Sequence, residues 1–188
     1  MHIIIFLGVN VKNYIILFFT IFSTILLAQD DFTVPMTPSK DQQLDIVAKY
    51  GSSLSKFDGS QKAYAQLKYC ISILDSRNKK ELKEHPAYST LGDVYMYGAT
   101  YLQKEYKEEK IIEMYNKALE LRSDPNSYYS LALIYKNKYD NAVKKNDSSK
   151  EVEYGKKVYD NFDKFVLLSG KGDVKKYKDI LNYFKTYK

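Results

Sequence analysis

Two short stretches, YSTLGDVY at residues 88–95 and YYSLALIY at residues 128–135, share one pattern that decides the fold. Each places an aromatic residue, a leucine, a small residue and a tyrosine at positions i, i+3, i+4 and i+7. On a helix these positions form one stripe, and the small residue leaves a notch where another helix can lie close. Because the unit occurs twice, the sequence predicts stacked helical pairs rather than one compact bundle.

The composition favours a helical protein with a sizeable core. The chain has 188 residues, of which 45% are hydrophobic, and it contains only 8 Gly and 4 Pro. This apolar content argues against a disordered chain, and the scarcity of helix-breaking residues favours helices. We therefore predict an all-α domain over residues 40–188.

Residues 1–28 have the pattern of a secretory signal peptide. A single basic residue, Lys12, precedes an apolar run that ends at Ala28, just before polar sequence. The alternative is an uncleaved membrane anchor, although the uninterrupted run is shorter than the roughly 20 residues of a membrane span. Residues 29–39 hold two prolines and no helical period, which predicts a flexible linker. We expect export to the periplasm or cell envelope of a bacterium.

Apolar stripes divide residues 40–188 into seven predicted helices, arranged as three hairpins and a C-terminal capping helix. Residues or segments that can open a helix mark their starts: Ser39, Ser60, His85-Pro86, residue 107, Asp124-Pro125, the polar segment 144–150 and Asp173. The charged residues 76–84 are interpreted as a loop or as the frayed end of the second helix.

The two stretches resemble the first helix of tetratricopeptide (TPR) repeats, whose unit is a pair of antiparallel helices. That first helix carries an aromatic residue, Leu, Gly and Tyr at the spacing of residues 88–95. Tyr115 and Ala118 are similar to the second helix, and Asp124-Pro125 resembles the closing Asp-Pro of the unit. The family period is 34 residues, whereas 40 residues separate the two stretches. Gly98 also resembles the glycine that ends the first helix of Sel1-like repeats. This family ranks second as a resemblance, because the spacing after Gly98 does not fit it.

The resemblance implies an α-α superhelix of about three TPR-like hairpins plus a C-terminal capping helix. TPR proteins hold a peptide or a partner helix on the concave surface formed by the first helix of each pair. The positions between the stripe residues would line that surface: Asp45, Lys49, Ser89, Asp93, Met96, Tyr129, Leu133 and Lys136. A subset of the family clamps a C-terminal carboxylate with Lys and Asn. Because Asp45, Ser89 and Tyr129 stand at such positions here, we predict no carboxylate clamp.

The sequence offers little chemistry for catalysis. His85 precedes Pro86 and is expected to be an exposed turn residue, because a lone imidazole lacks a positioned partner. Cys70 lies on an apolar stripe, which predicts a buried and inert thiol, while an intermolecular disulfide is the alternative. We find no phosphate-binding loop and no ligand set for zinc, so we predict no catalytic residue, no metal site and no cofactor.

The charge pattern bears on the partner. The net charge of +6 comes mainly from residues 132–188, where every basic residue is lysine. Because arginine is the usual residue for base and phosphate recognition, we predict no nucleic acid partner. Membrane contact is expected only through an uncleaved N-terminal segment. The sequence thus predicts an exported, non-enzymatic module that mediates protein–protein interactions, and the alternative is an accessory subunit or spacer of a larger envelope complex.

Overall fold

The computed structural model describes residues 38–188, and this part of the chain is helical, without a β-strand. The predicted all-α fold class is therefore confirmed. The predicted signal peptide, residues 1–28, and residues 29–37 of the predicted linker lie outside the described residues. Among residues 38–188, no helix combines the length and the apolar character that a membrane span requires.

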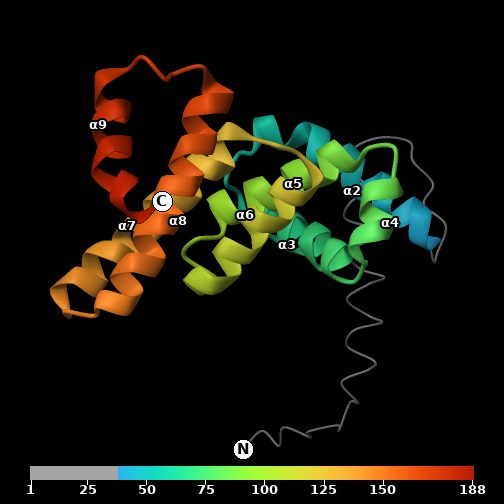
Figure 1. The fold of residues 1–188 in the computed structure, drawn as a ribbon. Coiled ribbons are helices and arrows are strands. Elements are labelled where there is room, and N and C mark those ends of the chain that lie inside the picture. The colour runs from blue at the N-terminus through green and yellow to red at the C-terminus, as the bar shows by residue number, and fades with distance from the viewer. Residues whose placement is uncertain (1–37) are drawn as a thin grey trace, which may run out of the picture. The chain divides into compact units, whose positions relative to one another are not determined.

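The described helices follow one another with short connections (Figure 1). Their bounds are α2 Lys40–Ser53, η1 Leu54–Lys56, α3 Gln61–Asp75, α4 Lys79–Glu84, α5 Tyr88–Tyr101, α6 Glu108–Leu121, α7 Pro125–Lys144, α8 Ser148–Ser169, α9 Lys175–Phe184 and η2 Lys185–Tyr187. A boundary between two units of the chain lies between Gln43 and Leu44, and the unit Leu44–Lys188 is compact. All contacts between helices that are described below lie within the unit Leu44–Lys188.

Local capping explains why several helices begin where the sequence predicts. The Ser39 hydroxyl accepts a hydrogen bond from the Gln42 N–H at the start of α2. Ser60 accepts from the Ala63 N–H, and the Asp124 carboxylate accepts from the Ser127 N–H with an N–O distance of 2.6 Å. Each cap satisfies a backbone donor that the first turn of a helix leaves without an intrahelical partner.

Two helix starts differ from the prediction. The charged residues 76–84 contain a separate helix, α4, because Asn78 and Glu81 form a reciprocal capping box and Leu82 is buried. Asp173 does not cap α9, which begins after Val174 without a side-chain cap. The Asp173 carboxylate instead accepts from the Lys178 ammonium at 3.1 Å.

The helices of this unit pack mainly against neighbours in the chain. The helices α5 and α6 form one pair and α7 and α8 form another, while α3 packs on α5, α6 on α7, and α9 on α8. The main core extends from α2 to α7, and the stripe residues Leu91, Tyr95 and Leu131 are at most 1% exposed within it. Two smaller clusters lie between α7, α8 and the C-terminal helices, around Phe162 and around Phe184.

Candidate functional site

The predicted partner-binding residues of α2 lie at the surface beside the start of α5. Asp45 and Lys49 are both exposed. The Asp45 carboxylate accepts from Nε2 of His85 at 3.2 Å, while Nδ1 of His85 accepts from the Ala87 N–H at 3.2 Å. These two contacts fix the proton of a neutral imidazole on Nε2. The side chain of His85 is only 9% exposed, so the expectation of an exposed turn residue is wrong, because this ring connects α2 to the start of α5.

The predicted residues of α5 are held in polar and apolar contacts. Ser89, Asp93 and Met96 are half-buried, and Met96 packs against the main core. Arg122 donates to the Asp93 carboxylate at 2.6 Å and lies 3.7 Å from the Asp124 carboxylate. Partial burial and the nearby Asp124 raise the pKa of Asp93, and the Arg122 charge acts in the opposite direction. Arg122 thereby links the exposed side of α5 to the beginning of α7.

The predicted residues of α7 divide into one packed side chain and two exposed ones. Tyr129 packs against α8, and its ring centroid lies 4.8 Å from that of Phe165. The Tyr129 ring therefore packs mainly within the α7–α8 pair and contributes to the core there. Leu133 is 44% exposed, and Lys136 forms an ion pair of 2.7 Å with Asp140 one turn further on. Leu133 and Lys136 are the predicted residues of α7 that a partner can reach.

A polar network between α3, α5 and α6 was not predicted as a unit. The Asp75 carboxylate accepts from the Lys110 ammonium at 2.8 Å, from the Lys117 ammonium at 2.7 Å and from the Tyr95 hydroxyl at 3.0 Å. Glu113 accepts from both lysines and so joins the same network. Partial burial raises the pKa of Asp75, but the hydrogen bonds and charges of the two lysines outweigh it, so the pKa lies below its usual value.

A cavity beside this network is too small for a metabolite. It has a volume of about 60 Å³, and its charged lining includes Lys79, Lys117 and Glu120. Lys79 and Glu120 form an ion pair of 3.2 Å with each other. Ligand pockets usually measure about 300–1,000 Å³, so this space has room for only a few water molecules. The contacts of the network itself join α3, α5 and α6.

The pH dependence of folding tests the network. The pKa values of Asp75 and Glu113 are lowered in the folded protein, so their stabilising effect is complete above their unfolded values, near pH 4, and is lost as the pH falls through the lower folded values. We expect Asp75→Asn to cost about 1–2 kcal/mol at neutral pH and to flatten the acid loss of stability. Thermal melting by circular dichroism between neutral and strongly acidic pH measures both effects.

The matched control is Asp173→Asn, because the Asp173 side chain is fully exposed in its ion pair with Lys178. This variant should melt as the parent protein does over the whole pH range. Equal acid sensitivity of Asp75→Asn and the parent protein would contradict the stabilising role of the network.

The remaining candidates for chemistry lie apart from one another. Cys70 is 1% exposed in the main core, and burial raises the pKa of its thiol, which confirms the prediction of a buried cysteine. Within residues 38–188, no three His, Cys, Asp or Glu side chains are grouped so that they could hold a metal ion.

Comparison with known proteins found no matching family model, no matching curated protein and no matching solved structure.

Proposed function

We propose that this chain is a TPR-like repeat protein that is exported, has no enzymatic activity, and binds a protein or peptide partner along α2, α5 and α7. The observation that carries the proposal is the repeated surface pattern on these helices. The leucines of their stripes, such as Leu91 and Leu131, are buried, while Asp45 and Lys49 on α2 and Leu133 on α7 are exposed between the stripes. The export part of the proposal rests on the signal-peptide pattern of residues 1–28.

The chemistry of the exposed positions indicates the kind of partner. Leu133 offers an apolar side chain that is 44% exposed, and Lys136 and Asp140 lie on the same side of α7 one and two turns away. Asp93 on α5 and Arg122 at the end of α6 add a polar contact at the edge of this surface. An amphipathic peptide or helix with one apolar anchor and mixed charges fits such a surface.

A photocrosslinking residue at position 133 tests this surface in cells that make the protein naturally. We expect position 133 to capture a specific protein, identified by mass spectrometry, and position 152 to capture none. Val152 is the matched control because it is also an exposed apolar residue, 57% exposed, but lies on α8. With the purified partner, Leu133→Asp should weaken binding by roughly tenfold or more, whereas Val152→Asp should bind as the parent protein does.

Two outcomes would overturn the proposal. Capture of the same partner at positions 133 and 152 would show that the surface of α7 is not selective. Capture at neither position would favour the alternative that the protein acts as a spacer.

A further inference from the structure

The turn between α8 and α9 exposes apolar side chains in an unusual concentration. Leu167 is 71% exposed, Leu168 is 44% exposed and Val174 is 44% exposed. The first two lie in the last turn of α8, and Val174 immediately precedes α9. Three exposed apolar residues within eight residues of sequence make this segment a candidate for a surface that binds another molecule. We call this segment, residues 163–178, the α8–α9 tip.

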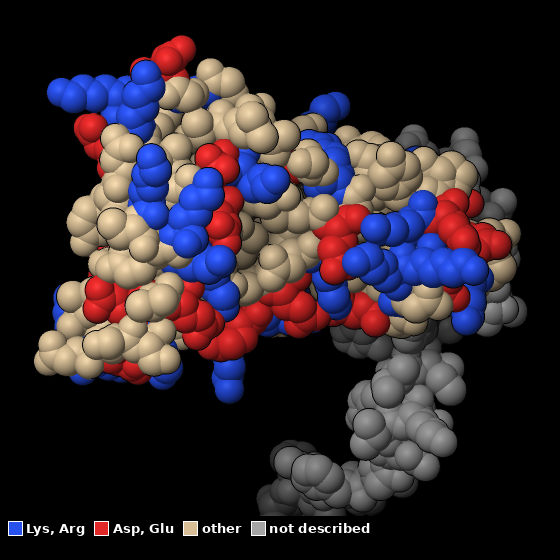
Figure 2. Space-filling view, viewed as in Figure 1, with Lys and Arg blue, Asp and Glu red and all other residues tan. Residues whose placement is uncertain are grey.

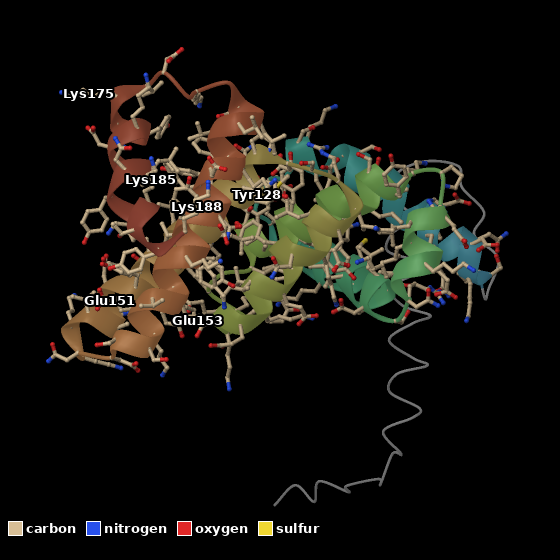
Figure 3. All side chains as sticks on the ribbon, in the orientation of Figure 1. Tyr128, Glu151, Glu153, Lys175, Lys185 and Lys188 are labelled. Carbon is tan, nitrogen blue, oxygen red and sulfur yellow. The ribbon has the colours of Figure 1, made fainter. Side chains whose placement is uncertain are left out.

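The same segment is rich in lysine. It contains five lysines and two aspartates, and Lys164, Lys175 and Lys176 are exposed and form none of the ion pairs found in residues 38–188. Figure 3 places Lys175 at the beginning of α9, on the outer side of the hairpin. Figure 2 shows lysine side chains beside uncharged surface at this end of the molecule, with acidic atoms also present. The two aspartates are Asp163 on α8 and Asp173 in the turn, and Asp173 is paired with Lys178.

The turn itself is held in place by the residues beneath it. Gly170 ends α8 with a φ of 65°, a left-handed conformation that glycine adopts without strain. The Val174 N–H donates to the Lys171 carbonyl, and the Lys171 ammonium lies 5.6 Å from the centre of the Phe165 ring. Tyr177 packs edge-on against the same ring at 5.3 Å. These contacts fix the turn between the exposed leucines at the end of α8 and the exposed lysines at the start of α9.

We propose that the α8–α9 tip binds anionic lipid bilayers, with Leu167, Leu168 and Val174 entering the headgroup region and the lysines contacting lipid phosphates. Exposed apolar side chains and exposed lysines within one short segment have the two features that interfacial membrane binding requires, burial of apolar area and attraction to anionic lipids. The long lysine side chain keeps its ammonium in the polar headgroup layer while its methylene groups contact apolar material. This membrane contact is separate from the proposed partner surface on α2, α5 and α7.

Other anionic partners fit the tip less well. Nucleic acid recognition usually relies on arginine forks and on aromatic rings that stack on bases. The tip has no arginine, and its tyrosine, Tyr177, is half-buried against Phe162 and Phe165. An acidic protein is the remaining rival, and the experiment below separates it from a bilayer.

Cosedimentation of the full chain with vesicles tests the proposal. We expect binding to vesicles of phosphatidylcholine with phosphatidylglycerol, which weakens as salt is added, and a clearly smaller bound fraction with phosphatidylcholine alone. Lys175→Gln with Lys176→Gln should weaken the anionic binding by about tenfold or more. Leu167→Ser with Leu168→Ser should weaken it by several-fold, because these side chains supply the apolar contact.

The connection between α7 and α8 offers a matched control. Lys144 is the last residue of α7, Lys145 follows it, and both are exposed, so Lys144→Gln with Lys145→Gln removes the same charge from another part of the surface. This control should bind anionic vesicles as the parent chain does. All variants change exposed side chains, and circular dichroism melting verifies that each is folded.

Three outcomes would overturn the proposal. Equal binding of the parent chain to both kinds of vesicle would show that anionic lipid is not required. An equal loss in the control variant would show that net charge alone matters. Unchanged vesicle binding of the tip variants would show that the tip does not contact the bilayer and would leave an acidic protein as its partner.

Discussion

A chain that ends before Asp173 is expected to aggregate. The removed residues 173–188 include α9, whose Tyr177 packs on Phe162 and Phe165 and whose Phe184 is 2% exposed. The Phe184 ring lies 5.0 Å from that of Tyr139, so truncation uncovers apolar surface on both α7 and α8. A newly exposed apolar face of this kind favours association. Size-exclusion chromatography and binding of an apolar dye measure the result.

A point substitution in α9 measures how much this helix contributes to the free energy of unfolding. Phe184→Ala removes a buried ring and should lower the free energy of unfolding by about 3 kcal/mol. The matched control is Asn182→Ala on the exposed side of α9, which should change it by less than about 0.5 kcal/mol. Urea unfolding measures both variants. A truncated chain that is soluble, monomeric and as stable as the parent protein would show that α9 does not cover the core.

The helix pattern of the unit follows from local sequence, with instructive exceptions. Caps at Ser60 and Asp124 are predictable because a capping side chain bonds to a backbone N–H three residues away. The helix α4 is too short for apolar periodicity to be visible, and its signal is the capping box of Asn78 and Glu81. Asp173 has the residue type of a cap, but its side chain pairs with Lys178 instead.

The candidate site was less predictable because its contacts join distant residues. Asp75 meets Lys110 and Lys117 across 35 and 42 residues of sequence, which no local pattern encodes. The sequence does show one part of this network, because the spacing of Lys110, Glu113 and Lys117 places all three on one side of α6. Tyr129 occupies a position between stripe residues, yet its ring packs on α8. The helical period locates a residue on its own helix but does not say which neighbour covers it.

The helices α2 and α5 approach each other closely at Gly51. We therefore expect a substitution there to change stability in the direction opposite to that given by helix propensity. Alanine is a better helix former than glycine by about 0.5–1 kcal/mol, yet we expect Gly51→Ala to destabilise the protein by about 2–3 kcal/mol. A methyl group at this position would lie 2.8 Å from Cγ2 of Thr90 and 2.9 Å from its carbonyl oxygen. The carbonyl is backbone and cannot turn aside, so the two helices would have to separate. Urea unfolding monitored by circular dichroism measures the change.

Gly92→Ala is the matched control, because it makes the same substitution at the contact within a pair. Its methyl group would meet Cβ of Leu121 at 3.2 Å and the Ala118 carbonyl at 3.3 Å, so shifts of a few tenths of an ångström suffice. The equivalent position of the second stretch is already an alanine, Ala132, which is 1% exposed. We therefore expect Gly92→Ala to be close to neutral. If Gly51→Ala is equally neutral or stabilising, α2 does not lie against α5 as closely as the approach of Gly51 to Thr90 requires.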